Sequence, residues 1–194
     1  MHIKSLVATA TTFAALLPSV LAGTARVKNN CPHPVYLWPV ANTGNVPSHT
    51  INPGGTYDEQ YRANPNGGGI SLKISNTPSD ATITQFEYTL AGSKVFYDIS
   101  NINGYPLVHG GVSLTPSSGQ CPAVICPAGE HFCNGAYNQP DDNHATHACS
   151  SSADLTMTLC LSGTQQIEQQ SQQRSPQENQ SQPRQPRHPR QFSF

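Results

Sequence analysis

Residues 83–90 read ITQFEYTL and residues 95–100 read VFYDIS, and both segments are rich in aromatic and β-branched side chains. In the first segment Gln85 and Glu87 fall on one face of an extended chain, and larger apolar residues fall on the other. A period of two residues is typical of a β-strand with one buried face. The two segments therefore predict two strands, with Asp98 as the acid of the second one.

The sequence around these two segments predicts further short strands separated by turns. The segments 52–55 and 64–69 are rich in Asn, Pro and Gly, which are turn residues. VYLWPV at 35–40 alternates poorly, so we expect a strand that is buried on both faces over part of its length. Three more segments have strand composition, namely TYDEQYR at 56–62, ISLKIS at 70–75 and DLTMTLC at 154–160. Short strands at this spacing predict an all-β fold, either a β-sandwich or a barrel.

The two ends of the chain differ from the body between them. Residues 1–22 combine a basic start, an apolar stretch and a small-residue cleavage site, which predicts a secretory signal peptide. Residues 164–194 are dominated by Gln, Pro, Ser and Arg, which predicts a disordered tail. Residues 23–163 are left as one domain. No other apolar run approaches the ~20 residues of a membrane span, so we expect none.

Charge is unevenly distributed between the body and the tail. Residues 23–163 hold five Lys or Arg against nine Asp or Glu, whereas the tail is positive by two. A basic tail could touch an anionic wall polymer or could act only to keep the protein soluble. Asn179, in the tail, is the standard glycosylation acceptor. For an acidic secreted domain of this kind we expect a monomer outside the cell or in the cell wall, with no nucleic-acid partner.

Six cysteines accompany the predicted signal peptide. A secreted chain passes through an oxidising compartment, so an even number of cysteines favours three disulfides over a reactive thiol. The sequence alone does not select the pairing.

Several blocks together resemble the thaumatin-like proteins. VKNNCPHPVYLWPV resembles the opening strand of that family, INPGGTYDEQYR followed by GGGISLKIS its next hairpin, and LTMTLC its closing strand. The most specific block is ITQFEYTL followed by VFYDISNINGYPL. The resemblance covers roughly residues 25–161. The short length and the low cysteine number are similar to the small fungal branch, the yeast-phase-specific antigens and other antigenic thaumatin-like secreted proteins.

The resemblance implies a thaumatin-like β-sandwich with a short loop region stapled by disulfides. A first-to-last disulfide is typical of the family, and here it would close a loop of about 130 residues, which stabilises by about 4–5 kcal/mol in the chain-entropy model. The resemblance implies Cys31–Cys160 as this disulfide. CPAVIC at 121–126 resembles a paired-cysteine segment of the family, which leaves Cys133 and Cys149 as its partners. The pairing of these four cysteines stays open, and we favour Cys121–Cys149 and Cys126–Cys133.

The resemblance also points to a cleft, because some thaumatin-like proteins bind or cut β-1,3-glucan in an acidic one. Asp98 matches one acid of that cleft, whereas Gln85 and Asn103 fall where active-looking relatives have acids. The basic cleft position falls on Lys73 or on Ile74, depending on one gap. An amide cannot transfer the catalytic proton. We therefore expect no catalytic residues and a cleft that binds carbohydrate such as β-glucan.

Other interpretations of the same residues stay open. Glu87 shares a strand face with Gln85 and could pair with Asp98 in a weak endo-β-1,3-glucanase. Asp141 or Asp142 could supply an acid from the loop region. Asp98 could instead anchor a turn. In a third class of function, the protein is an antigen or effector-like interaction protein that binds no carbohydrate.

Aromatic side chains could add the flat apolar surfaces on which sugars stack. The tyrosines considered for this role, most of which would be ordinary strand residues, are Tyr57, Tyr61, Tyr88, Tyr97 and Tyr105.

Histidines gather in the segments GEHFC and DDNHATHAC. His131, His144 and His147, with nearby carboxylates, have side chains that can bind Zn²⁺ or Cu²⁺. The His-x-x-His spacing is a weak signal, and solvated loop histidines are commoner. The mature chain would begin at Gly23, which excludes a copper site built on an amino-terminal histidine. We expect no metal and no cofactor.

Overall fold

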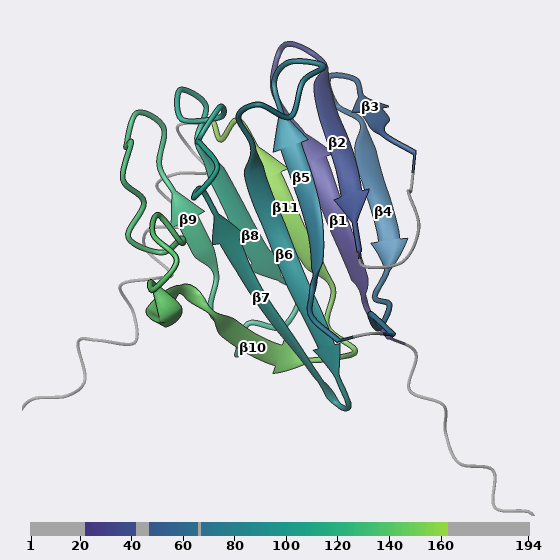
Figure 1. Cartoon of the computed structure of the whole chain (residues 1–194). Coiled ribbons are helices and arrows are strands. Elements are labelled where there is room, and N and C mark those ends of the chain that lie inside the picture. The colour runs from purple at the N-terminus through teal and green to yellow at the C-terminus, as the bar shows by residue number, and fades with distance from the viewer. Residues whose placement is uncertain (1–21, 42–46, 66, 163–194) are drawn as a thin grey trace, which may run out of the picture.

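The computed structural model describes residues 22–41, 47–65 and 67–162 and forms two facing β-sheets (Figure 1). The five-stranded sheet has the order β4 (Thr56–Gln60), β1 (Thr24–Asn29), β11 (Leu155–Leu159), β8 (Val112–Pro116) and β9 (Val124–Cys126). The six-stranded sheet has the order β10 (His147–Ser150), β7 (Lys94–Ser100), β6 (Thr84–Ala91), β5 (Ile70–Ser75), β2 (Val35–Val40) and β3 (His49–Ile51). A 3₁₀ turn, Asn143–Ala145, precedes β10. The expected all-β sandwich is confirmed.

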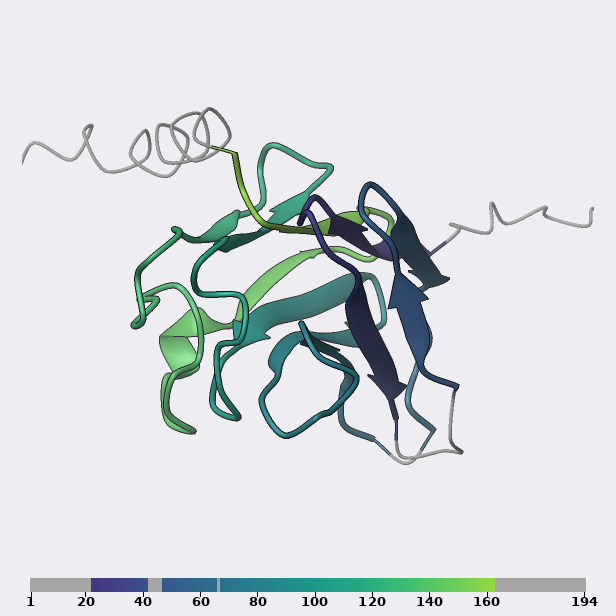
Figure 2. The same ribbon diagram turned by 90° about the horizontal axis from the view of Figure 1, so that it is seen from above.

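The two layers are seen edge-on in Figure 2. Neighbouring strands are mostly antiparallel, but β1 runs parallel to β11. The first and last strands of the domain therefore lie side by side in the middle of the five-stranded sheet. Within the described ranges, no helix is long and apolar enough to cross a bilayer.

The predicted ends of the chain fall almost wholly outside the described ranges. The signal peptide of residues 1–22, apart from Ala22, the tail of residues 164–194 and the acceptor Asn179 are not among the described residues. The domain boundaries stay predictions.

The core lies between the sheets and is built from alternate residues of each strand. Phe86 and Ile99 from the six-stranded sheet are fully buried, and they belong to one cluster with Leu155 and Met157 from β11. Removing a side chain of this size from water stabilises the fold by about 1.5–3 kcal/mol. The alternation in residues 83–90 therefore marks a β-strand whose apolar face packs into the core, as the sequence predicted.

The expectation for β2 is wrong, because this strand buries only one face. Val35, Leu37 and Pro39 are buried, whereas Tyr36 and Trp38 are partly exposed on the other face. Apolar residues occupy both faces, and this conceals the alternation in the sequence. Pro39 pairs with Leu72 of β5, but the pairing of β2 with β3 stops at Leu37, so Pro39 lies in a part of β2 that has a paired strand on one side only, where proline is tolerated.

Three disulfides hold the ends and the loop region of the domain. The first joins the chain just after β1 to the residue just after β11, across a sequence separation of 129 residues. The other two staple the segment between β9 and β10. The pairs are Cys31–Cys160, which the resemblance implied, and the two favoured pairs Cys121–Cys149 and Cys126–Cys133.

Candidate functional site

The candidate site lies on the outer face of the six-stranded sheet. Residues that the register places next to each other across β7, β6 and β5 point away from the core, because their neighbours Phe86 and Ile99 point into it. We call the following set the polar face: Ser71, Lys73, Gln85, Glu87, Asp98 and Ser100. The register thus brings four of the predicted cleft residues onto one surface.

Gln85 is the centre of a hydrogen-bond network that includes the fifth cleft residue, Asn103. The Gln85 amide nitrogen donates to Oδ1 of Asn103 at 3.2 Å and to the hydroxyl of Ser100 at 3.3 Å. Its Oε1 accepts from the hydroxyl of Ser71 at 2.9 Å. The two residues at matched acid positions are therefore in direct contact as a pair of amides, and neither carries a proton for acid–base chemistry.

The loop after β7 brings Asn103 beside Gln85, and Gly104 shapes that loop. Gly104 has a φ of 114°, and a Cβ atom there would come within 2.8 Å of Cγ2 of Thr82. The amide of Gly104 donates to the carbonyl of Asn101 at 3.0 Å, and the carbonyl of Asn103 accepts from the amide of Ile83 at 3.2 Å. The Asn-Gly dipeptide is thus required for the position of the Asn103 side chain.

Asp98 and Glu87 lie directly opposite each other on β7 and β6. Cβ atoms of such pairs are about 4.5–5.5 Å apart. The register follows from the two-residue turn Gly92-Ser93, which pairs Ala91 with Lys94. A two-residue hairpin turn is a readable sequence signal, and it would have identified this pair. The interpretation of Asp98 as a turn anchor is wrong, because it lies inside a strand.

The electrostatics of this pair favour one shared proton. Burial, and secondarily the Glu87 carboxylate, raise the pKa of Asp98 from its ordinary 3.8 to about 7. Burial also raises the pKa of Glu87, against the opposing effects of the Ser71 hydroxyl and the Lys73 ammonium. Oδ1 of Asp98 is buried and has no hydrogen-bond partner in the described part of the chain. A protonated carboxyl in the pair can donate a hydrogen bond as well as accept one.

Of the two alternatives for the basic position, only Lys73 is on this surface. Lys73 is partly exposed opposite Gln85, whereas Ile74 is completely buried on the other face of β5.

Three of the five tyrosines considered for sugar stacking are core residues, so that interpretation is wrong for them. Tyr61, Tyr88 and Tyr97 are at most 5% exposed, and Tyr57 and Tyr105 are partly buried against the core. The alternation that buries Phe86 also turns Tyr88 inward, because both are even-numbered residues of one strand.

The sequence analysis missed the aromatic residues that do point outward. Trp38 lies opposite Lys73, next to the polar face, and Tyr36 shares its side of β2. Phe96, 38% exposed, lies on the same side of β7 as Asp98. The alternation in VFYDIS places Phe96 on the side of Asp98, but both faces of β2 are apolar, so the sequence does not show which side of Trp38 is covered.

The loop region between β9 and β10 borders the polar face at the end of β7. Tyr137 forms an isolated parallel bridge with Ser100 there, and its amide donates to the carbonyl of Ile99 at 2.8 Å. Asp142 anchors the loop by accepting hydrogen bonds from the amides of Asn138 and Gln139. These hydrogen bonds lower its pKa. Asp141 is an exposed residue of the same loop.

The three histidines do not gather into one cluster. The ring of His131 faces that of His109, His144 contacts the carbonyl of Asn134 at 3.0 Å, and the ring of His147 packs near Tyr97. No group of three or more metal-binding side chains occurs in residues 22–41, 47–65 and 67–162.

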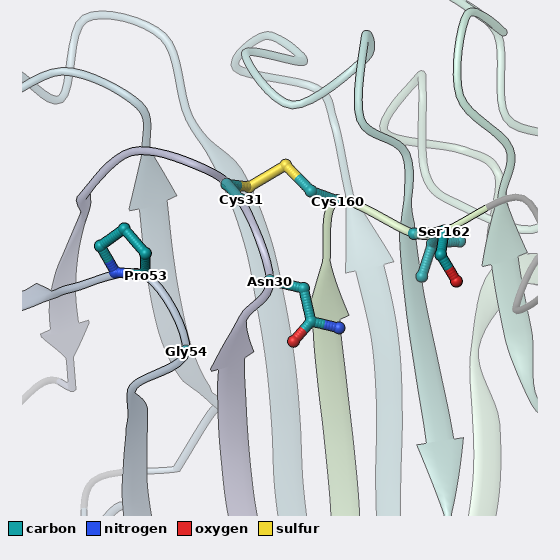
Figure 3. Close-up of a pocket in the computed structure, with 7 residues that line it drawn as sticks. Asn30, Cys31, Pro53, Gly54, Cys160 and Ser162 are labelled. Atoms are coloured by element: carbon teal, nitrogen blue, oxygen red, sulfur yellow. A yellow bond between two sulfur atoms is a disulfide. The ribbon is translucent and has the colours of Figure 1, made fainter.

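A separate shallow pocket of about 590 Å³ lies beside the Cys31–Cys160 disulfide (Figure 3). Asn30, Pro53 and Ser162 contribute to its walls. None of its lining residues belongs to the polar face, and its lining includes no acid, base or histidine. The polar face is therefore the better candidate for function.

Comparison with known proteins places the chain in a family. Residues 12–161 match the family model described as Blastomyces yeast-phase-specific protein. An antigenic thaumatin-like protein of Arthroderma benhamiae is 49% identical over 167 residues, which covers 84% of this chain and 86% of the relative. The secreted thaumatin-like protein calA of Emericella nidulans is 40% identical over 164 residues, with coverage of 81% and 95%.

A solved structure has the same fold. The protein elicitor MoHrip2 from Magnaporthe oryzae superposes with a TM-score of 0.62 at 26% identity, covering 72% of this chain and all of that one. The superposition shows that the two chains share a fold, and both fungal relatives are named thaumatin-like. The chain therefore belongs to the Blastomyces yeast-phase-specific protein family, within the fungal thaumatin-like proteins.

Proposed function

We propose that this protein is a secreted, non-catalytic carbohydrate-binding protein of the cell wall or cell surface that binds β-glucan on its polar face. The observation that carries the proposal is the contact between Gln85 and Asn103, two amides where cleft acids are expected. Secretion is supported by the predicted signal peptide and by the name of the relative calA.

The chemistry of the polar face suits a polyol. Amide and hydroxyl groups both donate and accept hydrogen bonds, as sugar hydroxyls do. Lys73, Glu87 and Asp98 are partly exposed on this face, and Asn103 is exposed at its edge, so these are the residues that a sugar can reach.

The arrangement of the carboxyls argues against hydrolysis. A glycosidase needs two carboxyl groups that flank the scissile bond, one as acid and the other as base or nucleophile. Glu87 and Asp98 are neighbours on a pleated sheet and project in the same direction. A sugar lying on this face meets both carboxyls from one side, which suits binding better than displacement.

The test is co-sedimentation of the purified protein with insoluble β-1,3-glucan, with cellulose and xylan as parallel polymers. We expect binding to β-1,3-glucan, and we expect Asn103→Ala to weaken it. Asn134→Ala is the matched control, since Asn134 is an exposed loop asparagine outside the polar face. A wild-type protein that stays in the supernatant with every polymer would refute the proposal.

The second candidate function is a weak endo-β-1,3-glucanase. The direct opposition of Glu87 and Asp98 favours it, because retaining glycosidases use two neighbouring carboxyl groups. This alternative requires release of reducing sugar from laminarin, lost in both Glu87→Gln and Asp98→Asn.

An antigen or effector-like role is favoured by names alone, since one relative is called antigenic and MoHrip2 is called an elicitor. In this role the protein would bind a partner protein and would not co-sediment with any of the polymers.

A further inference from the structure

We propose that Trp38 is the stacking residue of the site and that a neutral glycan chain lies across the strands, from Asp98 on β7 to Trp38 on β2. The proposal rests on the proposed function and deepens it. It names the direction of the bound chain, its charge class and the aromatic side chain that holds one end of it.

The sheet register aligns the groups that the proposal needs. Asp98 and Glu87 are partners across β7 and β6, and Lys73 and Trp38 are partners across β5 and β2. These four side chains are partly exposed and form a row across the outer face, whereas Gln85 and Ser100 are buried. Adjacent strands lie about 4.8 Å apart, so this row spans about 14 Å. A row of this length accommodates several sugar rings of an extended chain.

Trp38 is suited to end this row. Its side chain is partly exposed on the outer face, while the neighbouring Leu37 fills the core. An indole offers a large, flat, apolar surface, and the C–H face of a pyranose packs on such a surface while its hydroxyls stay hydrogen-bonded. The Lys73 ammonium lies opposite it on β5, the partly exposed Glu87 carboxyl follows on β6, and both can bind those hydroxyls.

The charges of the face select a neutral ligand. The charged side chains facing Asp98 from the packed strands are Glu87 on β6 and Lys73 on β5. Burial raises the pKa of both carboxyls, so the pair carries less negative charge than two free acids, and the Lys73 ammonium offsets part of what remains. A polymer of uronic acids would bring repulsion to the carboxylate end and gain attraction only at Lys73. A neutral glucan avoids this repulsion.

The chain contains one tryptophan, so its intrinsic fluorescence reports on this position without any label. Soluble laminarin oligosaccharides should change the Trp38 emission in a saturable way, and polygalacturonate at equal concentration should not. In co-sedimentation with insoluble β-1,3-glucan, Trp38→Ala should lose about tenfold in affinity, as expected for loss of an aromatic contact. Trp38→Phe should retain most of the binding.

Phe132→Ala is the matched control, because Phe132 is an aromatic that is 65% exposed in the loop region, away from the row. It should bind like the wild type. Circular dichroism of each variant checks the fold, and the wild-type emission titration needs no variant.

The outcomes separate the two proposals. If the wild type sediments with glucan but its emission does not respond to the oligosaccharides, the proposed function stands and the role of Trp38 is refuted. If neither assay detects binding, the proposed function itself fails. Stronger binding of polygalacturonate than of laminarin would overturn the neutral charge class.

Discussion

Asp98→Asn should stabilise the protein in alkaline solution and leave it nearly unchanged in acid. The pKa of Asp98 is raised from 3.8 to about 7, first by burial and then by Glu87. Between these two values the folded state holds a proton that the unfolded state has released. The free energy of unfolding of the wild type therefore falls as pH rises through this window.

The magnitude follows from the size of the shift. Each pKa unit corresponds to about 1.36 kcal/mol, so a rise of roughly three units costs up to about 4 kcal/mol once Asp98 is ionised. Asparagine keeps the shape of the neutral carboxyl and never ionises. The variant should thus exceed the wild type by up to about 4 kcal/mol at pH 8 and should match it near pH 4.

Urea unfolding at pH 4, 6 and 8, followed by circular dichroism with the disulfides intact, measures this difference. Asp141→Asn is the matched control, because Asp141 is exposed in the loop region, away from the polar face. A difference between Asp98→Asn and the wild type that is the same at all three pH values would refute the reasoning about the carboxyl pair.

Three further predictions concern the fold that supports the site. Gly104→Ala should destabilise by about 1–3 kcal/mol and weaken glucan binding, because of its φ of 114° and the clash with Thr82; thermal unfolding and co-sedimentation measure the two effects. Replacing Cys31 and Cys160 together by Ser should cost up to about 4–5 kcal/mol in urea unfolding, since their disulfide closes the longest loop of the domain. Phe86→Ala should cost about 3–5 kcal/mol in the same assay, and a cost below 1 kcal/mol would contradict its place in the core.

Local alternation made much of the six-stranded sheet predictable. In β6 the apolar and polar residues separate cleanly, so the burial of Phe86 and the outward position of Glu87 follow from the sequence. In β2 large apolar residues occupy both faces, and burial there depends on what the second sheet covers. Propensity alone carries no information on that covering layer, so the exposure of Trp38 was missed.

The position of the site residues depends on one local and one long-range strand pairing, and only the local pairing can be predicted from the sequence. The pairing of Glu87 with Asp98 is local, because a two-residue turn sets it. The pairing of Trp38 with Lys73 joins strands that are separated in sequence by β3 and β4, and β4 belongs to the other sheet. Only the folded topology places the tryptophan beside the cleft residues. The Cys31–Cys160 disulfide was implied by the family resemblance, and the spacing of the other four cysteines did not fix their pairing.

One measurement tests the central claim most directly, namely that the polar face binds glucan without cutting it. Purified protein is incubated with insoluble β-1,3-glucan, and both the protein left in solution and the reducing ends released are measured in the same tube. The account predicts depletion of the protein with no reducing ends above the blank, because Gln85 and Asn103 form an amide pair without a catalytic proton. Release of reducing ends by the wild type that disappears in Asp98→Asn would contradict it, and so would protein that remains entirely in solution.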